Sequence, residues 1–209
     1  MGAFTLDRKG LALAIILGLG IYYFGGMNYL LLILIFLILS THITRIGYYE
    51  KRSMGVYEYE RSWNNVLSNG IVPFLMTLLK GVVGPLPYIA SIASITSDKF
   101  ASEAGVFGGK PIEIFTFKEV NPGKSGAISL LGTFASIVGS IIIAILAIPL
   151  FHLNIFQVLI ISFSGFIGSM ADTVAGYFEE RGLGNKSTSN IIGALVGSIV
   201  AYLLGGLIL

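Results

Sequence analysis

Two aspartates in similar surroundings are the residues most able to support chemistry in this chain. Asp98 follows Ser94 by four residues, and Asp172 follows Gly168 by the same spacing. A helix places residues i and i+4 on one face, so each carboxylate would lie on a stripe of small and polar side chains. An ionisable group within a hydrophobic segment is costly in a membrane and indicates a functional site by default.

Carboxylate oxygens at the ends of two such segments could hold Mg²⁺, which prefers oxygen ligands and brings substrate phosphates with it. We therefore predict a Mg²⁺ site formed by Asp98 and Asp172, with Glu103 as a further ligand. The alternative is that these carboxylates pair with nearby lysines and arginines as anchors at the membrane boundary.

The stretch Asn-Pro-Gly-Lys-Ser-Gly at residues 121–126 predicts a phosphate-binding helix start. Backbone N–H groups at Gly123 and Gly126 could converge on an anion, and the N-terminus of a helix favours negative charge. Lys124 would lie beside that anion and is a candidate catalytic residue. The spacing is not that of a P-loop. The alternative is an ordinary turn and helix cap.

Further polar residues could bind the nucleotide or the acceptor. Asn69 could contact a ligand or only a neighbouring helix, and Ser129 would face the same site. The remaining candidates are basic or amide residues in two of the charged connections: Lys110, Lys118, Asn185 and Lys186.

Composition indicates a polytopic membrane protein. Of 209 residues, 55% are hydrophobic and only 11% are charged, against about 25% in soluble domains. We expect a single integral membrane domain over residues 1–209. The chain has no cysteine, which excludes thiolate catalysis and disulfides, and its net charge of +2 is too small to suggest a nucleic-acid partner.

Hydrophobic runs predict an all-α bundle of about seven transmembrane helices. They cover residues 10–25, 28–47, 64–80, 86–106, 125–150, 153–180 and 188–208. Each aspartate-bearing helix is followed by a basic segment and then by a helix rich in small residues. This pattern indicates an internal repeat, and such repeats often meet at the substrate site of membrane proteins.

The distribution of charge predicts the orientation. With a cytoplasmic N-terminus and an outer C-terminus, 12 of the 13 basic residues face the inside, and only Lys80 does not. All eleven acidic residues gather on the same side. We therefore expect a multi-pass protein of the cell membrane with a polar site at its cytoplasmic face.

Four stretches together carry a resemblance to a known family. They are residues 61–70, 97–105, 123–136 and 168–173, and they occur in the family's order. The chain resembles the integral membrane family that includes the phytyl-phosphate kinase of tocopherol biosynthesis, and more distantly dolichol kinases and phosphatidate cytidylyltransferases. The resemblance implies a kinase that uses a nucleoside triphosphate, with CTP favoured, to convert an isoprenyl monophosphate into the diphosphate.

The residues agree with that chemistry, because a phosphate acceptor is already ionised and needs no general base. Two alternative functions would use the same kind of site: a prenol kinase and a CTP-dependent lipid cytidylyltransferase. A membrane transporter is the rival from another class, but it should place its charges near the midplane. The expected partners are a nucleoside triphosphate, an isoprenyl phosphate lipid, the bilayer and possible second copies in a homodimer.

Overall fold

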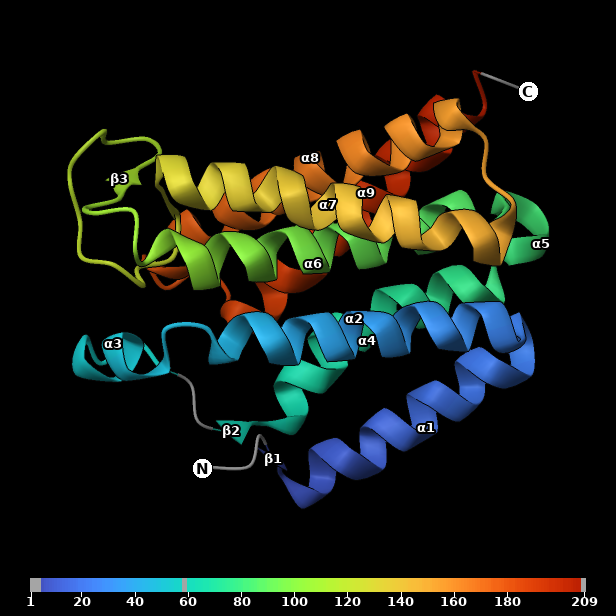
Figure 1. Ribbon diagram of the computed structural model, residues 1–209, viewed down its shortest axis with the longest axis horizontal. Helices are drawn as coiled ribbons and strands as arrows, with labels where there is room; N and C mark the ends of the chain where they lie inside the picture. The colour runs from blue at the N-terminus through green and yellow to red at the C-terminus, as the bar shows by residue number, and fades with distance from the viewer. Residues whose placement is uncertain (1–4, 58–59, 208–209) are drawn as a thin grey trace.

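The computed structural model describes residues 5–57 and 60–207, which form nine helices and four two-residue strands (Figure 1). The helices are α1 (Arg8–Gly25), α2 (Met27–Arg45), α3 (Tyr48–Ser53), α4 (Trp63–Leu78), α5 (Lys80–Val83), α6 (Leu86–Gly105), α7 (Leu130–Phe151), α8 (Ile155–Glu179) and α9 (Lys186–Gly205). The strands are β1 (Thr5–Leu6), β2 (Glu60–Arg61), β3 (Ile112–Glu113) and β4 (Ala127–Ile128). β1 pairs in parallel with β2, and β3 pairs antiparallel with β4, with Ile112 opposite Ile128.

The predicted all-α membrane bundle is confirmed. Each of the seven predicted hydrophobic runs forms a helix, although the predicted end at residue 208 lies outside the described residues. Within the described part, five helices are long and apolar enough to cross a membrane: α1, α2, α7, α8 and α9. The other two long helices differ in length or polarity, since α4 has only 16 residues and α6 carries serines, a threonine and Asp98. A count of seven spans stays a prediction.

The polarity of α6 is explained by its central position. Residues 87–97 are buried, and α6 packs against α2, α4, α7, α8 and α9. A helix surrounded by other helices can carry hydroxyl groups because its neighbours satisfy them. The Ser97 hydroxyl lies 2.6 Å from that of Ser136 on α7, and Ser136 in turn donates to Ser169 on α8 over 3.1 Å.

The predicted repeat corresponds to two helical hairpins, α6–α7 and α8–α9, that run in the same direction (Figure 1). Small residues allow the helices of these hairpins to approach closely. A Cβ atom at Gly193 on α9 would lie 2.8 Å from the carbonyl oxygen of Gly168 on α8, and one at Gly165 would lie 2.7 Å from the Ala93 side chain on α6. The aspartate-bearing helices α6 and α8 are therefore held side by side.

One helix start was predicted wrongly. The helix expected from residue 125 begins at Leu130, with Ser129 as its N-cap. Residues 127–128 instead form β4, and Gly126 has a φ of 75° that an α-helix does not allow. The glycine-rich stretch is therefore a turn that leads into a strand.

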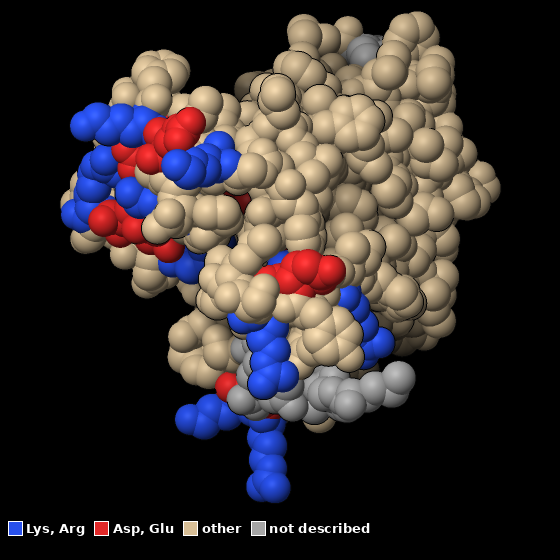
Figure 2. Space-filling view, turned by 60° about the vertical axis from the view of Figure 1, so that its left-hand side comes forward, with Lys and Arg blue, Asp and Glu red and all other residues tan. Residues whose placement is uncertain are grey.

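Charged side chains gather at one end of the molecule (Figure 2). The loops of both hairpins, the short helix α3 and the beginnings of α1 and α4 all lie at this end (Figure 1). Lys80 lies at the other end, where its amine donates to the Gly25 carbonyl over 3.4 Å. This separation agrees with the pattern seen in the sequence and places the polar chemistry at the end formed by the hairpin loops.

Candidate active site at the charged end

A cavity of about 420 Å³ opens among α2, α4, α6, α8, α9 and the loop between α6 and α7. Nine of the twelve predicted site residues line it, and they come from segments that are far apart in the sequence. They are Asn69, Asp98, Glu103, Gly123, Lys124, Gly126, Ser129, Asp172 and Lys186.

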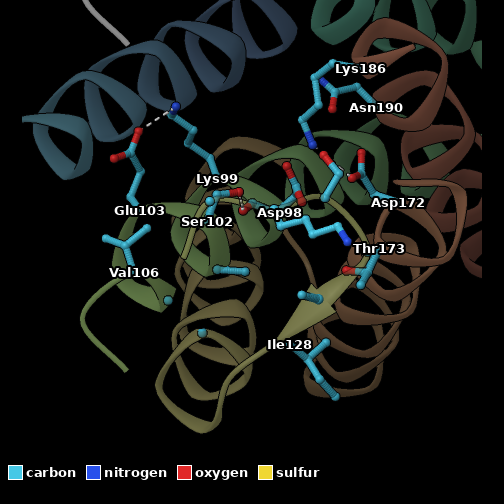
Figure 3. Close-up of a pocket in the computed structure, with 18 of the residues that line it drawn as sticks. Asp98, Lys99, Ser102, Glu103, Val106, Ile128, Asp172, Thr173, Lys186 and Asn190 are labelled. Carbon is cyan, nitrogen blue, oxygen red and sulfur yellow. Dashed lines mark hydrogen bonds and ion pairs between the residues drawn. The ribbon is translucent and has the colours of Figure 1, made fainter. Parts of the chain in front are cut away.

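Asp98 and Asp172 lie together at the centre of this cavity. Asp98 projects from α6 and Asp172 from α8, and the amine of Lys186 reaches toward them from the start of α9 (Figure 3). The Lys186 Nζ atom is 3.4 Å from Asp172 Oδ1. The two carboxylates repel each other, and both attract the ammonium group of Lys186. Asp172 is only 3% exposed, and the amine of Lys186 is the basic group beside it.

Asn190 is a residue of this cluster that the site prediction missed. With its amide nitrogen turned toward the nearby acceptors, it donates to Asp172 Oδ2 over 3.0 Å and to the Lys186 carbonyl over 3.2 Å. Its position four residues after Lys186 could have revealed it, because residues i and i+4 share a helix face. On the α4 side, Asn69 donates to Asn65 Oδ1 over 3.0 Å, and both asparagines line the cavity.

Glu103 is held apart from the aspartates. Its carboxylate accepts from Lys51 and Lys99, each over 2.6 Å, and from Thr44 over 2.8 Å. An α-helix turns by about 500° over five residues, so Glu103 points about 140° away from Asp98. Among the described residues no group of three His, Cys, Asp or Glu side chains could hold a metal ion, so the three predicted ligands do not converge.

Lys51 was not predicted because nothing in its local sequence marks it. It lies on the short helix α3, its side chain is 2% exposed, and its amine also donates to the Thr44 carbonyl over 2.6 Å. The contact joins α3 to α6 across 52 residues of sequence. It fixes one wall of the cavity, since Lys51, Lys99 and Glu103 all line it.

Lys124 is placed at the cavity by Glu113 in the preceding strand. Glu113 Oε1 accepts from Lys124 over 3.1 Å, and Oε2 accepts from Arg181 over 3.3 Å and from Thr116 over 2.5 Å. The hydrogen bond from Thr116, followed by those from Lys124 and Arg181, lowers the pKa of Glu113 from 4.5 to about 2. This carboxylate is therefore ionised at neutral pH and ties the loop to the end of α8.

The glycine-rich stretch lies against α8. Gly123 and Gly126 have φ angles of 89° and 75°, and any side chain at Gly126 would collide with the backbone of Tyr177. The Ser125 N–H donates to Glu180 Oε1 over 3.1 Å. Ser129 accepts from the Gly132 N–H and donates to the Gly105 carbonyl, both over 3.1 Å, so it caps α7 and joins it to α6.

The other three predicted residues lie outside the lining of the cavity. Lys110 is exposed on the loop and pairs with Glu119 over 3.3 Å, and Lys118 is exposed on the same loop. Asn185 caps α9 by accepting from the N–H groups of Ser187 and Thr188 over 3.0 and 3.1 Å. Asn185 therefore fixes the start of the helix whose first residue is Lys186.

Comparison with known proteins places this arrangement in a family. The profile described as "Integral membrane protein DUF92" matches residues 3–206. The chain belongs to this family. The match confirms the membrane assignment, and residues 3–206 include all the candidate site residues named above.

Relatives from two distant organisms align with 82% to 98% of this chain. "Uncharacterized membrane protein MJ0933" of Methanocaldococcus jannaschii is 37% identical over 207 residues, which is 95% of this chain and 85% of that protein. "Protein VTE6, chloroplastic" of Arabidopsis thaliana is 26% identical over 98% of this chain and 66% of that protein. "Protein PGR" of the same plant is 27% identical over 82% of this chain and 71% of that protein. These relatives confirm the family resemblance drawn from the sequence. No solved structure matches the chain.

The two carboxylates that line the cavity of this DUF92 protein match the oxygen ligands that Mg²⁺ prefers. Mg²⁺ is usually held by one or two carboxylates together with substrate phosphates, and it keeps several waters. Asp98 and Asp172 supply two carboxylates that line one cavity, and the amine of Lys186 lies 3.4 Å from Asp172 Oδ1. The site thus suits a metal that arrives with a phosphorylated substrate.

Proposed function

We propose that this protein is a kinase that transfers the γ-phosphoryl group of a nucleoside triphosphate, with CTP favoured, to an isoprenyl monophosphate. The observation that carries the proposal is the meeting of Asp98 and Asp172 beside Lys186 and Lys124 in one cavity at the charged end. The resemblance to the family that includes the phytyl-phosphate kinase supplies the substrate class. The coarser reading, a membrane enzyme of a prenyl-phosphate kinase-like family, is supported by the relatives.

In the proposed reaction an oxygen of the acceptor monophosphate attacks the γ-phosphorus of the nucleotide. A new phosphorus–oxygen bond forms, the bond between the γ-phosphorus and the β–γ bridging oxygen breaks, and the nucleoside diphosphate leaves. Because the attacking oxygen is already ionised, no side chain has to remove a proton. The requirement is alignment of the two phosphates and compensation of their charge.

The residues of the cavity match that requirement. Asp98 and Asp172 would hold Mg²⁺, which when bound supplies positive charge to the β- and γ-phosphates. Lys124 and Lys186 would contact phosphate oxygens, as lysines at phosphoryl-transfer sites do. Glu113 positions Lys124 without entering the cavity lining, and Asn190 positions Asp172.

The membrane orientation follows from the same distribution of charge. Charged side chains gather at the end that carries the cavity (Figure 2), and basic residues favour the cytoplasmic side of a membrane, so we propose that this end faces the cytoplasm. The N-terminus would then be cytoplasmic and the C-terminus external, in the cell membrane. Cysteines introduced at Lys80 and at Lys118 and probed with an impermeant thiol reagent test this, because only the Lys80 position should react from outside.

The function is tested with the purified protein in detergent, Mg²⁺, γ-³²P-labelled CTP or ATP, and a panel of prenyl alcohols and monophosphates. We expect label in a prenyl diphosphate, and its loss in Asp98→Asn and Asp172→Asn. Glu119→Gln is the matched control, because this exposed carboxylate contacts only Lys110 on the loop surface.

Other outcomes have defined meanings in this assay. Labelled pyrophosphate together with a CDP-lipid would identify a cytidylyltransferase, and label in a prenyl monophosphate would identify a prenol kinase. Absence of lipid-dependent turnover with either nucleotide, from protein shown to be folded, would overturn the kinase proposal.

A further inference from the structure

A second, apolar cavity of about 80 Å³ lies between α1, α2 and α4. We call it the α1–α2–α4 groove. All the residues that line it are apolar except Asn65 and Asn69, which lie on consecutive turns of α4. Gly18 on α1 and Gly70 on α4 contribute no side chain, so that backbone forms part of its wall.

The groove adjoins the candidate active site. Phe36, Asn65 and Asn69 line both cavities. A molecule that occupies both would therefore have an apolar part among α1, α2 and α4, and a polar part near Asn65 and Asn69 that faces Asp98 and Asp172. The change from apolar to polar walls occurs at the two asparagines.

The groove also opens toward the surface that contacts the bilayer. α1 and α2 are joined at Gly26 and diverge toward the charged end, where the beginning of α4 lies between them (Figure 1). Leu34 and Leu37 line the groove and are 41% and 38% exposed, on a helix apolar enough to cross the membrane. An apolar chain could enter sideways from the hydrocarbon layer without crossing the polar end.

We propose that the α1–α2–α4 groove binds the single hydrocarbon chain of the isoprenyl monophosphate acceptor. Its phosphate would lie at Asn65 and Asn69, next to the aspartates and the lysine amines. The first part of the chain occupies the groove, and the rest extends past Leu34 and Leu37 into the bilayer. The proposal rests on the proposed function for the identity of this acceptor.

The volume of the groove suits a lipid with one hydrocarbon chain. A space of about 80 Å³ between three helices holds part of one hydrocarbon chain, so the second chain of a phospholipid would have to stay outside it. The groove therefore favours a prenyl phosphate over phosphatidate as the occupant.

Binding is tested without turnover by photo-crosslinking. Geranylgeranyl phosphate that carries a diazirine on its second isoprene unit is added to the purified wild-type protein, irradiated, and the labelled peptides are mapped by mass spectrometry. We expect label on α1, α2 and α4, around Leu17, Leu34 and Val66. A phosphatidate with a diazirine at a matched distance should label the protein at least about tenfold less at these peptides.

A groove-filling variant provides the kinetic test. A Cβ atom at Gly18 would meet only Leu30 Cδ1, at 3.8 Å, so Gly18→Phe can place its ring in the groove. Leu19→Phe is the matched control, because Leu19 is the next residue, is 63% exposed and does not line the groove. We expect Gly18→Phe to raise the KM for geranylgeranyl phosphate about tenfold or more, because the lipid would lose the burial of a few CH₂ groups. The KM for the nucleotide should not change.

The outcomes separate this inference from the proposed function. Label at the groove without any turnover would support the lipid site and overturn the kinase. Turnover with label on helices other than α1, α2 and α4 would overturn the lipid site and leave the kinase. Equal labelling by the phosphatidate probe, or equal effects of Gly18→Phe and Leu19→Phe, would also overturn the single-chain groove.

Discussion

Removal of the Glu103 carboxylate should destabilise the protein strongly. In Glu103→Ala the ammonium group of Lys51, whose side chain is 2% exposed, would keep only backbone carbonyl partners. The loss of one partner from a buried ion pair costs about 3–5 kcal/mol, because the remaining charge is left uncompensated. Lys99 is 19% exposed and can turn toward water, so its contribution should be small.

The size of the effect can be expressed as a change in the unfolding midpoint. For a chain of this size a loss of 1 kcal/mol lowers the midpoint by about 2–4 °C. A loss of about 3 kcal/mol should therefore lower it by roughly 6–12 °C, as measured by thermal unfolding in detergent. Glu119→Ala is the control, because it removes an exposed ion pair with Lys110 and should cost less than about 1 kcal/mol.

The double variant Lys51→Met/Glu103→Leu tests the cause. Replacement of both charges by apolar groups of similar size should recover most of the loss, since neither charge is then left buried alone. The reasoning would be refuted if Glu103→Ala unfolded at the wild-type midpoint but lost phosphotransfer. Glu103 would then act as the metal ligand that the sequence suggested.

Three further outcomes follow from the structure. Lys124→Met should lower kcat/KM of the proposed kinase about 10²-fold and lower the midpoint less than Glu103→Ala does, because Glu113 keeps Thr116 and Arg181 as partners; an unchanged kcat/KM would remove Lys124 from the site. Gly126→Ala should lower the midpoint more than Gly182→Ala, because both have positive φ but only Gly126 also meets the backbone of Tyr177. Strain alone should cost about 1–2 kcal/mol, and equal midpoints would show that the loop is not held against α8. The stability supplied by Glu113 should be fully present above pH 4.5 and should be lost as the pH falls through about 2, because folding lowers its pKa. The difference in midpoint between wild type and Glu113→Gln should therefore shrink below pH 4.5, and a difference that stays constant down to pH 2 would contradict this assignment.

The sequence alone determined the features that depend on local pattern. Hydrophobic runs predicted the seven long helices, because a run that is long and apolar enough to cross a bilayer can be recognised without knowing which helices it packs against. The spacing of Asp98 from Ser94 and of Asp172 from Gly168 identified the two helix faces that meet at the cavity. The clustering of charge anticipated which end of the bundle carries the polar site, since buried charge is costly in lipid.

Only the tertiary structure decided which distant residues meet. Lys51 and Glu103 are 52 residues apart, and Glu113 and Arg181 are 68 apart. Helix α7 begins at Leu130 and not at the predicted residue 125, because residues 127–128 pair with β3. Local helix propensity gives no sign of such a pairing. The contact of Glu103 with Lys51, and the groove next to the candidate active site, depend on how whole helices are rotated and packed. Many weak contacts together set those rotations, so they cannot be read from any single stretch of sequence.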